Sequence, residues 1–313
     1  MGCAMSLSLH SVINEYVKYQ ENRVLSCEIS KVYFNEIKRS MNKFSEGVLD
    51  KPLTELKYRD IEFLKNRLGV KYAPKTVNKW VYEVKTFLKW CVLMEYLEHT
   101  NMGNVKGVKS QRKDIKPFTL DEISRVLDSL KGHNETIYLL IATAFYTGMR
   151  PSELLAMRWE NLCTETWSYR IDSAMVESVL KGTKTGSERI INLIKPLQSI
   201  FTKVGVKQEG FIFLNQYGKP YTTMHSICKY YWKPLLKELD IEYRPVHRCR
   251  HTYTVLSIQA GEDLNFISSQ LGHTSLEMLI KHYGSYIQRF NPKRVLKIES
   301  LFTNYLQNNI VMC

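Results

Sequence analysis

The feature that most constrains this fold is the helical spacing of apolar residues through the first hundred positions. Apolar side chains recur three and four positions apart near residues 12–17, 33–41, 60–68 and 74–92, which is the period of an amphipathic α-helix. Pro74 suits the first turn of a helix, and Gly69 suits the position that follows a helix end. The spacing therefore predicts four helices, the third ending before Gly69, and no sheet in residues 1–100.

A short basic segment separates this helical region from the rest of the chain. Residues 101–117 contain two Gly, one Pro, five Lys or Arg and one acidic residue, with few apolar side chains. Such a composition is typical of an extended linker. We therefore predict two domains, residues 1–100 and residues 118–313, joined by a basic linker over residues 101–117.

The second half of the chain combines helical patterns with a few strand-like segments. Thr119 and Glu122 form a capping box that opens a helix, and an apolar helix follows over residues 135–146. Residues 158–163, 168–171 and 189–193 are short and strand-like, and helical patterns return after Pro196. The predicted fold class is mainly α, with an all-α first domain and a second domain of α-helices with a small antiparallel β-sheet.

The charge of the chain indicates nucleic acid as a partner. The 44 Lys and Arg exceed the 31 Asp and Glu, giving a net charge of +13, and neutralising phosphates is the commonest use of such a surplus. The longest apolar run, residues 137–146, is too short to span a bilayer, and the N-terminus lacks a signal-peptide pattern. Seven Cys without a Cys-x-x-Cys pair favour reduced thiols. We therefore expect a cytoplasmic protein with no membrane partner.

Two sequence stretches carry basic residues at turns. In Thr-Gly-Met-Arg-Pro-Ser-Glu, residues 147–153, an apolar helix runs into a turn that places Arg150 just before a new helix, where backbone N–H groups can also bind an anion. In Lys-Gly-Thr-Lys-Thr-Gly-Ser, residues 181–187, a hairpin tip carries Lys181 and Lys184, and a lysine there can donate a proton to a leaving alkoxide. Taken singly, each stretch is more often a solvated loop.

A third stretch places His and Arg on one helix face. His247, Arg250 and His251 are three and four positions apart, so the face presents two imidazoles and a guanidinium. Two His at this spacing also suit zinc. However, Arg248 stands where the zinc-protease motif has Glu, and arginines repel a cation. Phosphate, which arginine holds bidentately, fits this stretch better.

The fourth stretch, Leu-Gly-His-Thr-Ser-Leu-Glu-Met from residue 271, places His273 ten residues before Tyr283. An aromatic side chain on a helix is usually core, whereas a tyrosine beside a phosphate site is a candidate nucleophile. Taken together and in this order, the four stretches resemble the motifs of the tyrosine recombinase (phage integrase) family over most of residues 115–290. Residues 1–100 are similar to the core-type DNA-binding domain of that family only in their helical, basic character.

The resemblance implies which residues hold the scissile phosphate. Arg150 and Arg250 resemble the two arginines that bind its non-bridging oxygens and neutralise charge in the transition state. His247 resembles the phosphate-binding histidine that also acts as a general base, and His273 resembles the second histidine on the same phosphate. We expect His251 to support this site.

The resemblance also implies which residues make and break bonds. Tyr283 resembles the nucleophile that forms a 3′-phosphotyrosine, and Lys184 resembles the general acid that protonates the leaving 5′-oxygen. Glu153 resembles the acidic residue that supports the first arginine. Tyr286 and Lys181, each three positions from the preferred residue, are the alternative assignments. The phosphotyrosine keeps the energy of the broken bond, so we expect neither a metal nor a cofactor.

The function implied is a site-specific DNA recombinase, an integrase of a phage or other mobile element that acts on double-stranded attachment sites. An excisionase or a host DNA-bending protein is an optional further partner. Apolar spacing after Pro292 predicts a tail helix, which either packs on its own domain or joins four protomers on DNA. The side chains expected to contact the DNA backbone lie before and within the linker: Lys75, Lys79, Lys106, Lys109, Arg112 and Lys113.

Three alternatives stay open. A Xer-like resolvase of DNA dimers would share all of this chemistry. A DNA-binding protein without catalysis would need the basic surface but not this set of side chains. A zinc hydrolase would be built on His247 and His251, and metal analysis of the purified protein distinguishes it.

Overall fold

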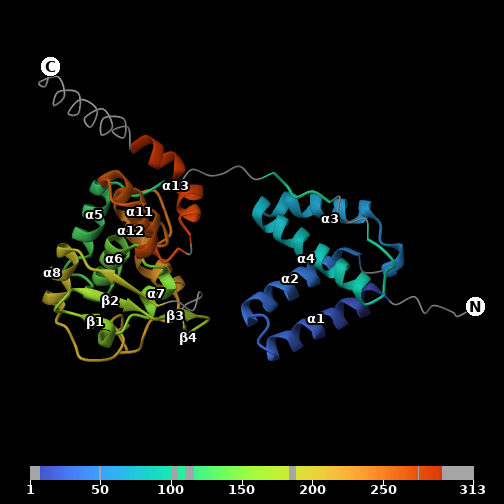
Figure 1. The fold of residues 1–313 in the computed structure, drawn as a ribbon, viewed down its shortest axis with the longest axis horizontal. Helices are drawn as coiled ribbons and strands as arrows, with labels where there is room; N and C mark the ends of the chain where they lie inside the picture. Colours follow the sequence, from blue (N-terminus) through green and yellow to red (C-terminus); the bar gives the residue numbers. More distant parts are fainter. Residues whose placement is uncertain are drawn as a thin grey trace, which may run out of the picture. The chain divides into compact units, whose positions relative to one another are not determined.

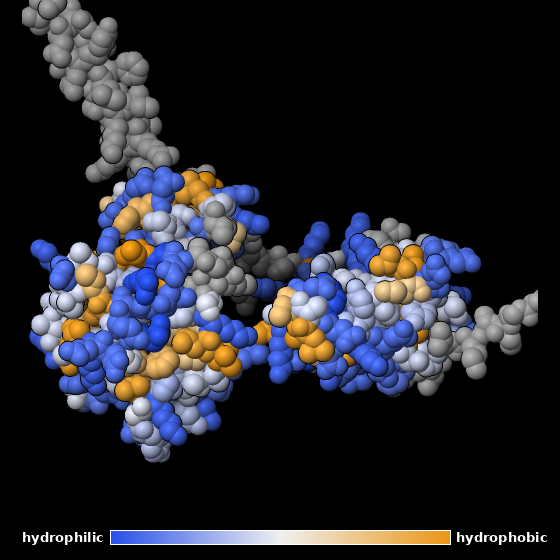
Figure 2. Space-filling model, turned by 60° about the horizontal axis from the view of Figure 1, so that its bottom comes forward, coloured by the Kyte–Doolittle hydropathy of each residue, from blue (hydrophilic) through white to orange (hydrophobic). Residues whose placement is uncertain are grey.

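The computed structural model describes residues 8–48, 51–100, 105–109, 116–182, 188–273 and 275–290, with side chains up to residue 287. The chain divides into two compact units, residues 1–113 and 114–313 (Figure 1). In the described part of the chain, no helix is long and apolar enough to cross a membrane. The face drawn in Figure 2 is largely hydrophilic, with scattered apolar patches.

The described residues of the first unit form four α-helices and no strand longer than an isolated bridge. A short 3-10 turn, Leu53–Glu55, precedes the third helix. The all-α character predicted from the apolar spacing is therefore confirmed. The helices are α1 (Leu9–Leu25), α2 (Lys31–Val48), α3 (Tyr58–Lys71) and α4 (Pro74–Leu93).

The third helix ends later than predicted. Gly69 lies within α3, and the N–H of Tyr72 closes the last turn by donating to the carbonyl of Leu68 at 2.9 Å. Pro74 explains this end, because a proline disfavours helical backbone at the residue before it. Ala73 accordingly is extended, with φ −61° and ψ 147°. A single glycine, in contrast, is tolerated within a helix.

Aromatic rings hold the helices of the first unit together. Tyr16, Phe44 and Phe87 are fully buried. The ring of Tyr16 on α1 lies 5.2 Å from that of Phe87 and 5.1 Å from that of Trp90, both on α4. Phe44 on α2 lies 6.0 Å from Phe87. Such tilted and edge contacts each add about 0.5–1.5 kcal/mol to the area buried, and they join α1, α2 and α4 in one core.

Residues 105–109, within the predicted linker, belong to the first unit and pack against its helices. Val105 is buried in its core. The amide of Asn78 on α4 donates to the carbonyl of Val108 at 2.9 Å and accepts the Val108 N–H at 2.6 Å. Lys65 on α3 donates to the carbonyl of Lys106 at 3.0 Å. These contacts satisfy backbone groups that an extended segment would otherwise leave to water.

The second unit contains a large apolar core, a smaller apolar cluster around Val255 and Leu279, and two small antiparallel sheets. Its described elements are α5 (Leu120–Leu130), α6 (Glu135–Thr147), α7 (Pro151–Leu155), β1 (Leu162–Cys163), β2 (Ser168–Ile171), β3 (Ser173–Val176), β4 (Val179–Gly182), β5 (Arg189–Asn192), α8 (Lys195–Val204), α9 (Met224–Ile227), a π-helical turn (Cys228–Trp232), α10 (Lys233–Glu238), α11 (Arg248–Ala260), α12 (Leu264–Leu271) and α13 (Leu276–Phe290).

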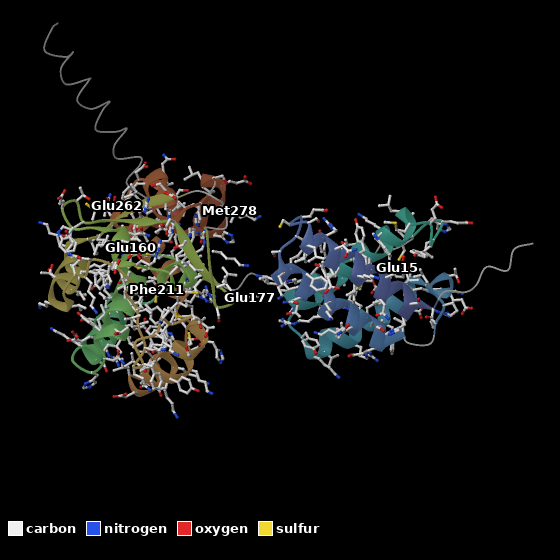
Figure 3. The ribbon with its side chains drawn as sticks, turned by 90° about the horizontal axis from the view of Figure 1, so that it is seen from below. Glu15, Glu160, Glu177, Phe211, Glu262 and Met278 are labelled. Atoms are coloured by element: carbon white, nitrogen blue, oxygen red, sulfur yellow. The ribbon has the colours of Figure 1, made fainter. Side chains whose placement is uncertain are left out.

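The predicted small antiparallel sheet is present, in the order β1-β2-β5. The predicted first strand differs, because Trp159–Asn161 is a 3-10 turn and only Leu162–Cys163 is strand. The N–H of Trp159 donates to the carbonyl of Gly210 at 2.9 Å, and Arg158 forms an isolated bridge with Phe211. Residues 158–159 therefore pair with this distant segment, marked by Phe211 in Figure 3, instead of with β2.

The hairpin of β3 and β4 was not predicted. Its strands pair in the register Val176↔Val179, and the two turn residues, Glu177 (labelled in Figure 3) and Ser178, have φ of 49° and 64°. Positive φ at both positions is the geometry of the tight hairpin turns that favour Asn-Gly. Glu-Ser lacks that signature, so the turn could not be recognised in the sequence.

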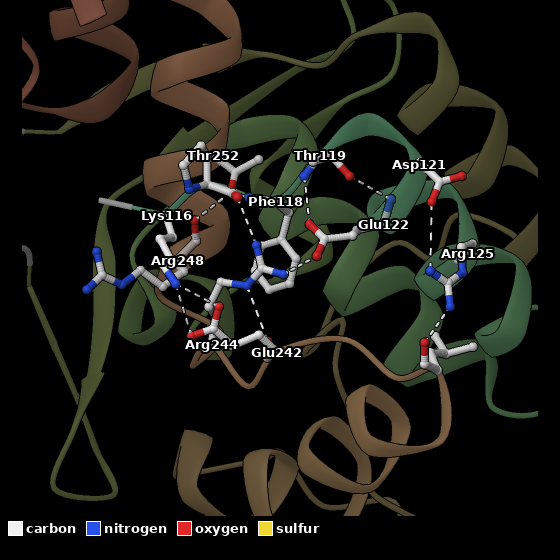
Figure 4. Close-up of polar contacts among 12 residues, drawn as sticks. Lys116, Phe118, Thr119, Asp121, Glu122, Arg125, Glu242, Arg244, Arg248 and Thr252 are labelled. Atoms are coloured by element: carbon white, nitrogen blue, oxygen red, sulfur yellow. Dashed lines mark hydrogen bonds and ion pairs between the residues drawn. The ribbon is translucent and has the colours of Figure 1, made fainter. Parts of the chain in front are cut away.

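Arg244 anchors the start of the second unit to the segment that leads into α11 (Figure 4). Its guanidinium lies 3.9 Å from the ring centre of Phe118 and donates to the carbonyl of Pro117 at 2.8 Å and to the carboxylate of Glu122. The N–H of Phe118 donates to the hydroxyl of Thr252 on α11 at 2.9 Å. These contacts hold α5 and α11 together, and α11 carries part of the candidate site.

Candidate active site

A glycine turn between α6 and α7 places Arg150. Gly148 ends α6 with φ 63°, and a Cβ there would lie 2.6 Å from the ring of Tyr253, so the backbone conformation and the space both require glycine. Arg150 caps α7: its N–H and its Nη1 each donate to the carboxylate of Glu153 at 2.8 Å. Its Nη2 donates to the carbonyl of Gly272 at 3.1 Å. The Arg150 side chain is 40% exposed, so the guanidinium is oriented yet accessible.

Arg250 on α11 joins the same two segments. Its Nη1 donates to the carbonyl of Gly148 at 2.9 Å, and its Nη2 donates to the carbonyl of Leu271 at 2.7 Å. Arg150 reaches the neighbouring carbonyl of Gly272. The two guanidinium groups therefore converge on the turn that ends α12, although 100 residues separate them in the sequence.

The turn after α12 also orients His273. Gly272 has φ 65°, and the N–H of His273 donates to the carbonyl of Ser268 at 3.0 Å. The Nδ1 atom of His273 is buried and has no hydrogen-bond partner among the described residues. A buried imidazole nitrogen without a partner, beside two arginines, suits an oxygen of a bound anion.

Tyr283 lies on α13 against α11 and α12. Its side chain is 4% exposed and belongs to a small apolar cluster with Val255, Ile267 and Leu279. Its hydroxyl is hydrogen-bonded to Nδ1 of His251, and the two ring centres are 5.8 Å apart. His247, at the start of α11, lies 6.0 Å from His251 by ring centres. The candidate nucleophile and both imidazoles of the third stretch are thus neighbours.

Burial, and after it the neighbouring positive charges, lowers the pKa values of three basic groups in this site. Burial, together with the charge of Arg150, lowers the pKa of Arg250 to about 10. Burial and the charges of Arg250 and Arg150 lower the pKa of His273 to about 4. Burial and the charge of Arg248 likewise lower the pKa of His251 to about 4. Several positive charges lie close together here. A bound anion would therefore be attracted to the site and would raise the pKa of His251 and of His273.

The pKa of the phenol moves the other way. Burial raises the pKa of Tyr283, against the opposing effects of a hydrogen bond with Thr254 and of the Arg250 charge. The hydroxyl is therefore protonated at neutral pH, and it needs a base to become a nucleophile.

A buried ion pair that was not predicted completes the site. Arg189, the first residue of β5, donates from Nη1 and Nη2 to the carboxylate of Glu153 at 2.9 and 2.7 Å. Burial would raise the pKa of Glu153, but its bonds with Arg189 and Arg150 lower it overall. Arg189 lies within the third predicted strand, yet nothing in the sequence singles out this arginine from its neighbours.

The remaining predicted residues lie elsewhere or outside the described residues. Lys75 and Lys79 are exposed on α4, where Lys79 pairs with Glu36, and Lys106 and Lys109 are exposed on the segment held by Asn78. Lys181 is exposed on β4. Lys184, Arg112, Lys113 and the predicted tail helix, residues 295–306, fall outside the described residues.

No group of three or more His, Cys, Asp or Glu in the described ranges is arranged to hold a metal ion. His247 and His251 are neighbours, and the other groups near His251 are Arg248, Arg250, His282 and Tyr283. The site is thus rich in donors for an anion.

The sequence of the second unit decides the family. Residues 116–287, more than half of the chain, match the phage integrase family. The chain belongs to the phage integrase family. The four stretches of this chain lie within the matched residues, so the family predicted from them is confirmed.

Two curated relatives cover most of this chain. It is 25% identical over 260 residues to the putative defective protein IntQ of Escherichia coli, covering 74% of this chain and 65% of IntQ. It is 26% identical over 302 residues to the ICEBs1 integrase of Bacillus subtilis, covering 88% of this chain and 80% of that protein. The chain thus spans slightly less than two thirds of IntQ and four fifths of the ICEBs1 integrase.

Two solved structures share its fold. The Tn1549 transposon integrase, in complex with a circular intermediate DNA, is 18% identical with a TM-score of 0.74, covering 87% of this chain and 94% of that one. A λ integrase tetramer bound to a Holliday junction is 16% identical with a TM-score of 0.71, covering 86% of this chain and 78% of that one. The predicted fold class, mainly α with a small antiparallel sheet, is confirmed.

Proposed function

We propose that this protein is the integrase of a phage or other mobile element, which cuts and rejoins double-stranded DNA through a 3′-phosphotyrosine on Tyr283. One observation carries the proposal: Arg150 and Arg250 converge on the turn of residues 271–272 beside the unpartnered Nδ1 of His273. Two guanidinium groups and an imidazole within one small site can donate hydrogen bonds to the oxygens of a phosphodiester.

The chemistry follows from these groups. The phenol oxygen of Tyr283 attacks phosphorus, and its O–P bond forms as the bond from phosphorus to the 5′-oxygen breaks. Neutral His251 is hydrogen-bonded to that phenol and can take its proton, with His247 as the neighbouring base. Lys184 gives a proton to the departing 5′-oxygen. Arg150 and Arg250 neutralise the charge that gathers on the non-bridging oxygens.

A suicide substrate tests the proposal. A nicked duplex carrying the target site should leave a covalent protein–DNA adduct with the wild-type protein and with Tyr286→Phe, three positions further along α13. Tyr283→Phe should bind the same DNA and form no adduct. An adduct with Tyr283→Phe and none with Tyr286→Phe would move the nucleophile to Tyr286.

The partners proposed are DNA and further copies of this chain, acting in the cytoplasm. The λ integrase forms a tetramer on a Holliday junction, and a tail helix after Pro292 is the segment we expect to join protomers here. Truncation after Lys293 should preserve binding to one site and weaken assembly on two sites in native gels. A truncated protein that assembles and recombines normally would refute a role of the tail between protomers.

A further inference from the structure

The buried carboxylate of Glu153 is shared by two arginines. Its Oε1 accepts from Nη1 of Arg150 at 2.8 Å and from Nη1 of Arg189 at 2.9 Å. Its Oε2 accepts from the Arg150 N–H at 2.8 Å and from Nη2 of Arg189 at 2.7 Å. The side chain of Glu153 is 4% exposed and that of Arg189 is 12% exposed. Water therefore solvates the carboxylate little, and the two arginines balance its negative charge.

The net charge of these three side chains decides how strongly Arg150 attracts a phosphate. The three side chains carry two positive charges and one negative charge. If Arg189 were absent, Glu153 and Arg150 would form a neutral pair, and the field of Arg150 at the phosphate would be largely cancelled. Arg189 pairs with Glu153 in a fork geometry that only arginine offers, so the three side chains together keep one net positive charge. Arg150 is the exposed member of the group, with a side chain that is 40% exposed.

Arg189 also supports the turn that receives both site arginines. Its Nε donates to the carbonyl of Gln270 at 3.0 Å. Its guanidinium packs so closely on Gly272 that a Cβ there would lie 2.8 Å from Nη1. The carbonyls of Leu271 and Gly272, the next two residues, accept from Arg250 and Arg150. One side chain thus contacts the carboxylate beside Arg150 and the turn beside Arg250.

We propose that Arg189 is a positioning residue for strand cleavage: it neutralises Glu153 so that Arg150 keeps its charge for the scissile phosphate, and its bond to the carbonyl of Gln270 holds its guanidinium in place for that pairing. This inference rests on the proposed function. Arg189 itself need not touch the DNA.

The test compares variants on two suicide substrates. One substrate carries an ordinary scissile phosphate, and the other carries a methylphosphonate, in which a methyl group replaces one charged oxygen. The variants are Arg189→Met, Arg189→Lys, Glu153→Gln and the double variant Glu153→Gln/Arg189→Met. Arg170→Met is the matched control, because Arg170 lies on β2 opposite β5 and its side chain is 53% exposed. Adduct formation by the wild type and its loss in Tyr283→Phe test the proposed function separately.

We expect Arg189→Met to cleave the phosphate on the order of 10²-fold more slowly, the scale of losing one transition-state donor, while it binds DNA like Arg170→Met. On the neutral methylphosphonate its deficit should shrink to about tenfold or less, since less charge has to be compensated. The double variant should cleave like Glu153→Gln alone, because the carboxylate that Arg189 balances is gone. Arg189→Lys should lie between Arg189→Met and the wild type.

Three results would overturn the inference. The first is cleavage of the phosphate by Arg189→Met at the rate of Arg170→Met. The second is an equal deficit on the two substrates. The third is a double variant whose deficit is the product of the two single deficits. If Arg189→Met does not fold, the cleavage rates of the double variant and of Glu153→Gln are compared instead. Neither of these two variants has a buried carboxylate that lacks its arginine partner, and unequal rates would show that Arg189 does not act through Glu153.

Discussion

Replacing Gly272 by alanine tests how the active-site turn is built. Gly272 ends α12 with φ 65°, in the left-handed region. Alanine there costs about 1–2 kcal/mol through its Cβ. The new Cβ would also lie 2.8 Å from Nη1, 2.9 Å from Cζ and 3.0 Å from Cδ of Arg189. These atoms cannot move freely, because Arg189 is held by Glu153 and by the carbonyl of Gln270.

Gly261 is the matched control. It ends α11 with φ 84°, and a Cβ there would meet nothing within 4 Å. Gly261→Ala therefore reports the cost of the backbone conformation alone, including any gain from a less flexible unfolded chain. The difference between the two variants isolates the clash with Arg189, which we expect to cost about 1–3 kcal/mol, the range for an overpacked site. For a unit of this size, that corresponds to a further decrease in Tm of roughly 2–12 °C.

Thermal unfolding of the two variants and cleavage of the suicide substrate form the assay. Gly272→Ala should unfold at the lower temperature and cleave on the order of 10²-fold more slowly, because displacing a positioned group by about 1 Å has that effect. Gly261→Ala should cleave at the wild-type rate. Equal values of Tm and equal cleavage rates for the two variants would refute the packing of Arg189 against this turn.

Three further predictions concern the acid, the bases and the metal. Lys184→Ala should slow cleavage far more than binding, and a substrate with sulfur at the 5′-bridging position should restore its rate; rescue of Lys181→Ala instead would move the role of acid to Lys181. The folded protein lowers the pKa of His251 and of His273 to about 4, from an ordinary 6.5. Between pH 4 and 6.5 the unfolded chain therefore binds more protons than the folded protein, so the DNA-free protein should lose stability as the pH falls from about 6.5 to 4. Thermal unfolding at pH 7 and pH 5 measures this loss. A double His251→Gln/His273→Gln variant that loses as much stability as the wild type would show that these two histidines do not cause it. Cleavage should continue in EDTA, and DNA binding should weaken steeply with salt; cleavage that stops on chelation and returns with zinc would favour the hydrolase alternative.

Local patterns in the sequence were enough to predict the helices of the first unit and the small sheet. Apolar spacing identified α4 from Pro74 onward, and the capping box of Thr119 identified the start of α5, because these signals act within a turn or two of helix. The prediction that α3 ends before Gly69 was wrong, since Pro74 acts on the preceding residues more strongly than one glycine does. The β3–β4 hairpin was missed, because its Glu-Ser turn has none of the usual turn residues.

The resemblance of four short stretches was enough to identify the family and to nominate Arg150, Arg250 and Tyr283. Their convergence could not be calculated from spacing, because it depends on the glycine turns at residues 148 and 272 meeting across the second unit.

Only the tertiary structure decided which groups surround these residues. Arg189 and Glu153 lie 36 positions apart on a strand and a short helix, and no periodic pattern relates two such positions. Asn78 holds Val108 across 30 positions in the same way. The sequence determines local backbone preference through steric and hydrogen-bonding effects that reach only a few residues. The pairing of buried charges depends on which distant segments the packed core brings together, since a carboxylate removed from water must find its partners in three dimensions.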